Sequence, residues 1–338
     1  MVLIDSVYVN NSSGLILLSY LIEKIKKNKM DLFFLFDKRT EEFFRKDENL
    51  INKIFISNSY FERKNFYKKH KNDFSHILCF GNVPPPIKMN SKVFVYFHQR
   101  LFLNIPDNFS LKMKVVYKIK QLIINYYKSN TNYWLVQTKS IQISLAEKYY
   151  KGSLNNIKIL PFYPPINFES FSVKRLNNSF LYVSSSFTHK NHEQLIYAFC
   201  EAYEHLKEGS LCLTVPDSDI QLCNLIIEKN RQGYPIKNIG FIPREQLAKI
   251  YLSHEYLIFP SLSESLGLGL LEAIDGGCKI IASHLPYTFE VCEPSLTFDP
   301  LERDSIKNAI ITAVSEKLPI SKKLVSNDIN QLFLLLTE

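Results

Sequence analysis

The most informative stretch of the sequence combines a buried strand, a polar loop and a helix start that contains glycine. Residues Tyr256–Phe259 have the apolar pattern of a short strand, and a helix is predicted from about Leu266 to Asp275. Gly267 and Gly269 fall in the first turn of that helix. Glycine lets a ligand approach the backbone closely, and the N–H groups at a helix N-terminus attract anions. The segment therefore predicts a phosphate-binding site.

Two glutamates flank this helix start. Glu264 precedes it and Glu272 follows eight residues later, a separation of about 12 Å along a helix. Carboxylate pairs that act on one glycosidic bond lie within roughly 5–9.5 Å of each other. These two are too far apart for that role, but they could bind opposite ends of an elongated ligand whose phosphates lie between them. A nucleotide-sugar has this shape.

The motif P-S-x-x-E-x-x-G-L-x-L-L-E-A, which contains both glutamates, resembles the signature of the family 4 glycosyltransferases, retaining enzymes of GT-B fold. The resemblance implies that Glu264 contacts donor-sugar hydroxyls and that Glu272 contacts the ribose hydroxyls. It also implies that the amides of Leu266, Gly267 and Leu268 bind the diphosphate. An ordinary amphipathic helix with a glycine C-cap is the alternative, but the joint placement of proline, serine, glutamates and glycines favours the binding site.

The same resemblance implies a second group of donor ligands. Family members hold the diphosphate with a lysine at another helix start, a position that Lys190 occupies here. An arginine usually precedes that lysine by five or six residues, where this chain has Ser184 or Ser185, so hydroxyls and amides would have to replace one cation. Phe241 and Ile242 lie in the turn that borders the nucleobase in the family. A solvated lysine at a helix start is the alternative for Lys190.

Candidate residues in the first half are fewer. The apolar run Val93–Phe97 ends at His98, and the carboxyl end of a parallel strand faces the crevice where ligands bind. Family members often have a histidine there, against the donor sugar and the acceptor; a histidine satisfied at a strand end is the alternative. Ser13 and Gly14 are predicted in a loop that lines the cleft, although a plain helix N-cap fits them equally well.

Strand-like and helical patterns alternate along the whole chain, which predicts an α/β fold with two Rossmann-like domains. The proline-rich segment 161–166 interrupts all periodicity and marks the linker. We therefore expect an N-terminal acceptor domain at 1–165 and a nucleotide-sugar-binding domain at 166–319. The resemblance implies a GT-B architecture in which a helix at 320–338 crosses back to the first domain.

Composition limits the possible classes of protein. The chain has 338 residues, 46% of them apolar, and six cysteines without a C-x-x-C spacing, so reduced, buried thiols are expected. Apolar runs are too short to span a membrane, and the strand pattern at Met1–Asp5 does not suggest a signal peptide. A cytoplasmic protein is therefore predicted, with possible peripheral association at the inner face of the plasma membrane.

The charge is unevenly distributed. Residues 1–165 contain 26 Lys and Arg against 12 Asp and Glu, whereas residues 166–338 contain 15 against 21. The basic half suggests an anionic partner. Its segment 110–128 interleaves five lysines with apolar and tyrosine residues, as in a helix that lies on an anionic membrane. A helix that packs on the sheet with its lysines in solvent fits this pattern equally well.

Together these features predict a retaining glycosyltransferase that uses a nucleoside diphosphate sugar and a glycan or lipid-linked acceptor, as in bacterial O-antigen synthesis. His98 and Glu264 are the predicted catalytic residues. Neither a cofactor nor a metal is expected, and Asp217-x-Asp219 is interpreted as a turn and helix cap. A sugar-nucleotide epimerase of the same architecture is the main alternative. A non-catalytic nucleic-acid-binding protein would explain the basic half but not Glu264, Glu272 and Lys190, so no nucleic acid is expected as a partner.

Overall fold

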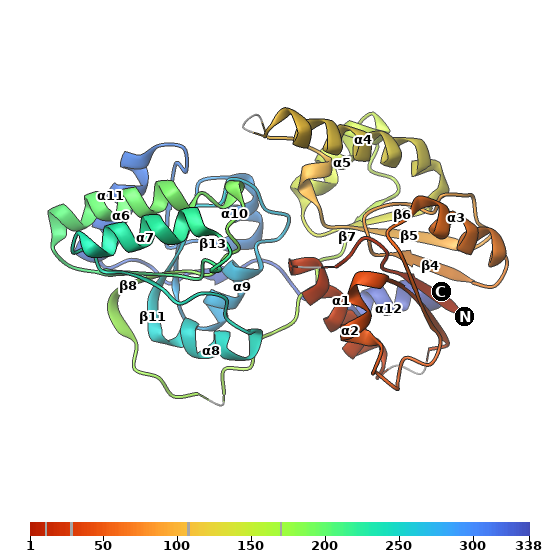
Figure 1. The fold of residues 1–338 in the computed structure, drawn as a ribbon, viewed down its shortest axis with the longest axis horizontal. Helices are drawn as coiled ribbons and strands as arrows, with labels where there is room; N and C mark the ends of the chain where they lie inside the picture. Colours follow the sequence, from red (N-terminus) through yellow and green to blue (C-terminus); the bar gives the residue numbers. More distant parts are fainter. Residues whose placement is uncertain (11, 28–29, 107–108, 170) are drawn as a thin grey trace. The chain divides into compact units, whose positions relative to one another are not determined.

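The computed structural model describes residues 1–10, 12–27, 30–106, 109–169 and 171–338. The chain divides into two compact units, which are drawn in Figure 1. The first unit contains Met1–Pro164 and Ser326–Glu338, and the second contains Pro165–Val325. Among the described residues, no helix is both long and apolar enough to cross a membrane. All six cysteines have free thiols; five are buried and Cys223 is half-buried.

The first unit is a parallel sheet covered by helices on both faces. Its strands are β1 (Val2–Asp5), β2 (Leu32–Asp37), β3 (Lys53–Ile56), β4 (His76–Cys79), β5 (Lys92–Phe97), β6 (Tyr133–Val136) and β7 (Ile157–Ile159). Its helices are α1 (Ser12–Ile25), α2 (Glu41–Phe44), α3 (Tyr60–Lys69), α4 (Leu111–Tyr127), α5 (Lys139–Tyr150) and α12 (Ile329–Thr337). Short 3-10 turns occur at η1 (Lys38–Thr40), η2 (Arg100–Phe102) and η3 (Lys128–Asn130).

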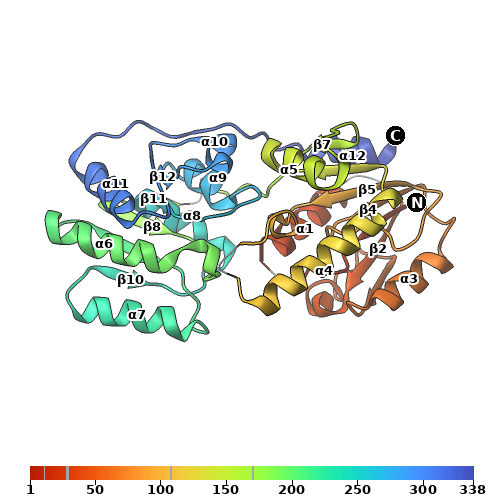
Figure 2. The same ribbon diagram turned by 90° about the horizontal axis from the view of Figure 1, so that it is seen from above.

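The strand order β3-β2-β1-β4-β5-β6-β7 is the doubly wound order expected for a Rossmann-like domain. Helices α3, α4 and α5 lie on one face of the sheet, and α1, α2 and α12 lie on the other (Figures 1 and 2). Strands buried on both faces need near-continuous apolar runs, and the run Val93–Phe97 seen in the sequence covers β5 except for its first residue.

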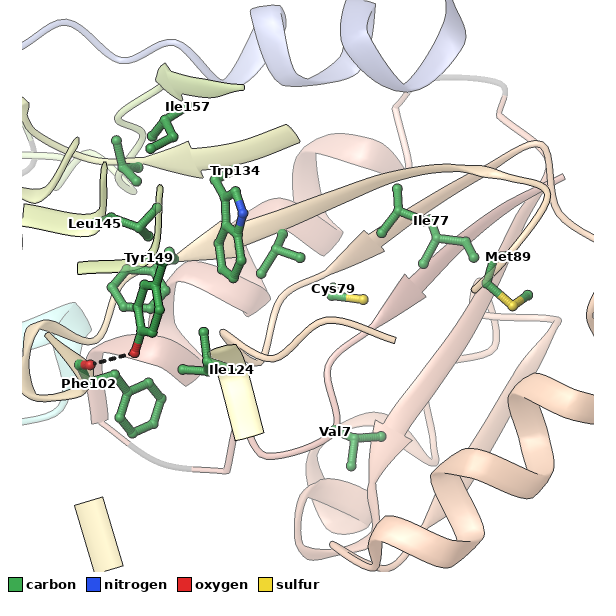
Figure 3. Close-up of a cluster of buried hydrophobic side chains, with 14 of the residues drawn as sticks. Val7, Ile77, Cys79, Met89, Phe102, Ile124, Trp134, Leu145, Tyr149 and Ile157 are labelled. Carbon is green, nitrogen blue, oxygen red and sulfur yellow. Dashed lines mark hydrogen bonds between the residues drawn. The ribbon is translucent and has the colours of Figure 1, made fainter. Parts of the chain in front are cut away.

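The core beneath α3, α4 and α5 is drawn in Figure 3. Trp134 of β6 lies in it beside Leu145 and Tyr149 of α5. The Tyr149 hydroxyl donates to the Phe102 carbonyl at 3.0 Å, so the segment after β5 is tied to α5. Helix α4 contributes a single fully buried side chain, Ile124.

The second unit repeats the same plan. Its main sheet contains β8 (Leu176–Tyr182), β9 (Ser210–Leu213), β10 (Ile236–Asn238), β11 (His254–Phe259), β12 (Lys279–Ser283) and β14 (Leu296–Phe298), in the order β10-β9-β8-β11-β12-β14. Its helical elements are η4 (Thr188–Lys190), α6 (His192–Leu206), α7 (Ile220–Arg231), α8 (Arg244–Ser253), α9 (Leu268–Asp275), α10 (Pro286–Val291) and α11 (Arg303–Ser315). Helices α6, α7 and α11 cover one face, and α8 and α9 cover the other (Figure 1).

The C-terminal segment returns to the first unit, as expected. Asp328 donates its amide to the Pro161 carbonyl at 2.8 Å, and the Asn327 side chain donates to the Tyr163 carbonyl at 2.6 Å. The return occurs at Ser326 rather than at residue 320. Residues before it stay with the second unit because β15 (Lys322–Lys323) pairs with β13 (Cys292–Glu293).

A buried ion pair in the first unit was not predicted. Arg63 of α3 lies 2.7 Å from the Asp5 carboxylate, and both side chains are almost completely buried. The Tyr67 hydroxyl also donates to this carboxylate, at 2.6 Å. Arg63 donates further to the carbonyls of Val83 and Pro84. The pair therefore fixes the segment that follows β4.

Replacing Arg63 by methionine should destabilise the first unit by about 3–5 kcal/mol, because it leaves Asp5 buried without its cation. Urea unfolding followed by fluorescence measures this directly, since Trp134 is the single tryptophan and lies inside the first unit. Arg45→Met is the control: Arg45 is exposed and pairs with Glu41 one turn away, an arrangement worth about 0.5 kcal/mol. Equal losses in the two variants would contradict the structural role of the buried pair.

Candidate active site

The segment after β11 has the predicted strand–loop–helix form, but the helix begins at Leu268 rather than at Leu266. Gly267 has φ of 70°, a left-handed conformation that cannot belong to the helix and that costs other residues about 1–2 kcal/mol. Leu266 and Gly267 therefore form the turn that leads into α9, and Leu268 is the first helical residue. The N–H groups of the first helical turn have no acceptors within the helix, so an anion can bind there.

Gly269 has a packing role. A β-carbon at this position would lie 3.4 Å from the Phe259 ring and 3.7 Å from the Val183 carbonyl oxygen. These distances are ordinary van der Waals contacts, so a β-carbon alone would fit, whereas a longer side chain would meet the Phe259 ring and the Val183 carbonyl. A small residue here therefore lets the first turn of α9 lie close to the carboxyl ends of β8 and β11.

Lys190 and Glu264 form an ion pair, with Nζ 2.5 Å from Oε1, and both side chains are mostly buried. Lys190 also lies 5.9 Å from the centroid of the Phe259 ring. Backbone contacts set this position. The Tyr182 hydroxyl donates to the Lys190 carbonyl at 2.8 Å, and the Leu262 amide donates to the His189 carbonyl at 2.8 Å. The loop after β11 and the turn before α6 are thus tied together, and a cation is held beside the start of α9.

Glu272 lies in the interior of the second unit and is almost completely buried. Its Oε1 is paired with Arg244 at the start of α8, and its Oε2 accepts a hydrogen bond from the Tyr251 hydroxyl at 3.0 Å. Burial raises the pKa of Glu272, and the Arg244 guanidinium opposes that rise. Arg244 and Tyr251 therefore contact Glu272, the residue predicted to bind the ribose hydroxyls. The sequence analysis did not predict these two contacts.

The turn after β10 carries Phe241 and Ile242. The Phe241 side chain is 80% exposed, and Ile242 is half-buried. Asn238 holds this turn: its side-chain oxygen accepts from the amides of Val215 and Gly240, at 3.0 and 3.2 Å. An exposed aromatic ring on a fixed turn can stack on a planar group such as a nucleobase.

The serines in place of the family arginine have local partners. Ser184 exchanges hydrogen bonds with Thr214 through its amide and carbonyl, and its hydroxyl donates to the Ser185 carbonyl at 3.0 Å. Ser185 itself is exposed. The Asp-x-Asp segment is a turn and helix cap, as predicted, because the Asp219 carboxylate accepts from the Leu222 amide at the start of α7.

In the first unit, His98 follows β5 and is held by the β4–β5 connection. Its amide donates to the Asn82 side chain at 2.7 Å, and its Nε2 lies 3.0 Å from the Phe80 carbonyl oxygen. A carbonyl oxygen only accepts, so Nε2 donates in this contact. The Asn82 side-chain nitrogen lies 3.3 Å from the same Nε2. Burial lowers the pKa of His98 to about 4, so the ring is neutral at pH 7. Asn82 was missed by the sequence analysis.

Ser13 and Gly14 lie in the first turn of α1, not in a loop as predicted, because the helix begins at Ser12. Ser13 is exposed. A β-carbon on Gly14 would lie 3.1 Å from Cε1 of His98, so the glycine makes room for the imidazole. Within the first unit, the structure therefore brings Gly14 and His98 together.

The sequence is similar to known glycosyltransferases. Residues 166–331 match the model of the family "Glycosyl transferases group 1". The O-antigen chain mannosyltransferase B of Escherichia coli is 29% identical over 99 residues, which is 29% of this chain and 26% of that protein. The matched segment thus spans about a quarter of that relative's length.

Solved structures resemble most of the chain. Sucrose-phosphate synthase of Thermosynechococcus elongatus has a TM-score of 0.70 at 16% identity, with 93% of this chain and 90% of that chain covered. HepE of Anabaena in complex with UDP-glucose has a TM-score of 0.68 at 14% identity, with 93% and 89% covered. The two Rossmann-like sheets and these similarities confirm the predicted GT-B fold class.

Acid should destabilise the fold through three histidines that are partly or fully buried. Burial lowers the pKa of His98, His189 and His192 to about 4, whereas an unfolded histidine titrates near 6.5. The unfolded chain therefore binds more protons than the folded chain in that window, so stability falls as the pH drops from about 6.5 to about 4. His192→Gln should reduce this pH dependence by up to about 1.4 kcal/mol per pH unit, because His192 is buried and no partner of its Nε2 occurs within the described residues.

The measurement is denaturant unfolding at constant ionic strength across this pH range. His205→Gln is the matched control because His205 is exposed on the same helix, α6. The comparison uses the slope with pH, so a uniform loss of stability in the His192 variant does not affect it. Identical slopes in wild type and His192→Gln would contradict the assignment of a buried neutral histidine.

Proposed function

We propose that this protein is a retaining glycosyltransferase that uses a nucleoside diphosphate sugar, and the match of residues 166–331 to the glycosyl transferases group 1 model supports this. The acceptor is a hydroxyl group of a glycan or of a lipid-linked glycan. The observation that carries the proposal is the Lys190–Glu264 pair beside the N-terminus of α9. A cation, a carboxylate and a row of backbone amides at one place suit a ligand that has both phosphates and hydroxyls.

In this proposal, the amides at Leu266, Gly267 and Leu268 and the Lys190 ammonium bind the diphosphate. Glu264, on the other side of Lys190, accepts hydrogen bonds from the donor-sugar hydroxyls. The bond between the anomeric carbon and the phosphate oxygen breaks, and the acceptor oxygen bonds to that carbon on the same face. The acceptor proton passes to the departing diphosphate. Lys190 and the helix dipole stabilise the charge that develops on the leaving group, so we infer that no metal is required.

The remaining contacts to the nucleotide-sugar come from α9, from the turn after β10 and from the loop after β8. Glu272 binds the ribose hydroxyls, the exposed Phe241 ring and Ile242 border the nucleobase, and Ser185 contributes a donor near the phosphates. Because Glu272 is already paired with Arg244 and Tyr251, the ribose must either join or displace these partners. Arg244 is therefore a second determinant of nucleotide affinity.

The first unit supplies the acceptor site in this proposal. His98 orients the sugar or the acceptor hydroxyl, and Ser13 and Gly14 lie in the first turn of α1, with Gly14 next to the imidazole. Similarity to an O-antigen chain mannosyltransferase of Escherichia coli supports a role in bacterial surface-polysaccharide synthesis. Such a reaction uses donors made in the cytoplasm, and we place the enzyme there, with the acceptor at the inner face of the plasma membrane.

A panel of UDP-, GDP-, ADP- and dTDP-sugars tests the donor assignment. One of them should raise the melting temperature, and Lys190→Met should weaken its binding about 10- to 100-fold, the loss expected for one charged hydrogen bond. Isothermal titration gives the affinity. Lys207→Met is the matched control, since Lys207 pairs with Glu204 on the surface of the same unit. An equal loss in both variants would exclude a specific role for Lys190.

The same panel separates transfer from the rival activities. Release of nucleoside diphosphate that depends on an added glycan acceptor supports the transferase. Conversion of one nucleotide-sugar into an epimer without acceptor would instead establish a sugar-nucleotide epimerase. Binding of none of the nucleotide-sugars would refute the proposed function.

Glu272→Gln tests the ribose assignment. The wild type should bind the preferred nucleoside diphosphate more tightly than its 2′-deoxy analogue, about 10-fold if one charged hydrogen bond is lost. The variant should show a clearly smaller preference, because the neutral amide oxygen of glutamine accepts a weaker hydrogen bond than the carboxylate. Titration calorimetry of both ligands on both proteins forms a double-mutant cycle. If the variant keeps the full preference for the ribose form, Glu272 does not bind the hydroxyl.

A further inference from the structure

Helix α4 (Leu111–Tyr127) packs on the first unit along a narrow inner stripe. Ile124 is buried in the core (Figure 3). Tyr117 packs against that core and is half-buried. The Gln121 side chain donates to the Leu103 carbonyl at 3.4 Å. These positions recur every three or four residues, so they mark the side of the helix that faces the sheet.

The outer side of α4 is apolar. Leu111 is 82% exposed, Leu122 67% and Tyr126 76%. The exposed large apolar residues of this stripe are Leu111, Val115, Val116, Ile119, Leu122, Ile123 and Tyr126. At 100° per residue they fall within about 140° of arc, opposite the inner stripe. The amphipathicity of a typical surface helix is thus reversed, because solvent is expected to meet polar side chains. We call these seven residues the outer stripe.

Basic residues accompany the outer stripe. Lys112 lies within it, Lys118 flanks one edge and Lys120 flanks the other. No Asp or Glu occurs between residues 108 and 146, so the sequence around the helix carries no opposing charge. A shallow apolar hollow of about 430 Å³ lies at the C-terminal end of the helix, lined by Ile119, Leu122, Ile123, Asn125, Tyr126 and Tyr127.

We propose that the outer stripe of α4 docks on an anionic lipid surface. The apolar side chains enter the boundary between headgroups and acyl chains, and the flanking lysines pair with lipid phosphates. Tyr126, at the end of the stripe, has the amphipathic side chain that is common at that depth. A second copy of the chain fits less well, because pairing two outer stripes would bring lysines together without carboxylates from this region.

The docking surface is connected to the candidate acceptor residue. Lys120 of α4 lies 5.5 Å from the centroid of the Phe102 ring in η2, and η2 begins two residues after His98. Lys148 of α5 donates to the Leu103 carbonyl at 2.7 Å, which holds the same segment from its other side. A lipid-linked acceptor on that surface would therefore approach the His98 segment. This last step rests on the proposed function, whereas the docking does not.

Cosedimentation of the full-length protein with vesicles tests the docking without donor or acceptor. The wild type should bind vesicles of equal parts phosphatidylcholine and phosphatidylglycerol at least tenfold more strongly than pure phosphatidylcholine, and less so at high salt. Two double variants test the two parts of the surface: one carries Leu122→Ser with Tyr126→Ser, and the other carries Lys112→Glu with Lys118→Glu. Each should bind the anionic vesicles about tenfold more weakly, or worse. These side chains are exposed, so the fold is retained, and circular dichroism verifies this.

The control is a double variant with Lys174→Glu and Lys317→Glu, which changes the charge by the same amount at exposed positions of the second unit. It should bind the anionic vesicles as tightly as the wild type does. Failure of the wild type to bind, or equal binding by the α4 variants, overturns the docking proposal. Self-association that the α4 variants abolish, seen by light scattering, would reassign the outer stripe to contact between copies and also overturns it. Transfer to a short water-soluble acceptor, measured separately, reports on the proposed function alone.

Discussion

One hydrogen bond holds the loop after β11 against the turn before α6, and the candidate site in the second unit depends on it. The Leu262 amide donates to the His189 carbonyl, and the Lys190–Glu264 ion pair closes the same junction. Without this junction, the start of α9 and the lysine would be two unrelated helix termini. With it, a cation, a carboxylate and the positive end of a helix dipole share one location, because parallel strands end at one edge of the sheet.

The two signature glutamates have different environments, which suits different tasks. Glu264 is paired with a lysine, whose flexible ammonium can change partner when a phosphate arrives. Glu272 is held between Arg244 and Tyr251 in the interior, where burial raises its pKa. An anionic donor that engages Lys190 would release Glu264 toward sugar hydroxyls, so binding of the phosphates and orientation of the sugar would be coupled through one ion pair.

Strand β5 was recognised from the sequence because a parallel strand buried on both faces requires a continuous apolar run. The predicted run Val93–Phe97 lies within its bounds, Lys92–Phe97. The predicted start of α9 was two residues too early. The sequence does not reveal that Gly267 has a positive φ, which keeps it out of the helix. Arg63 and Asp5, Asn82 and His98, and Arg244 and Glu272 were not predicted as pairs, because their partners lie 16 to 58 residues apart and follow no period.

Helix α4 shows a different limit of sequence analysis. Its apolar and basic residues are interleaved, so the pattern fitted both a helix packed by its apolar side and a helix that presents that side outward. In the structure, the narrow stripe of Tyr117, Gln121 and Ile124 attaches the helix, and the seven large apolar side chains of the outer stripe remain exposed. Exposed apolar area of this extent opposes solubility and is uncommon on a monomer unless it serves binding. The lysines that border it reduce self-association by mutual repulsion while leaving the surface able to bind anions, which is the combination that an anionic bilayer requires.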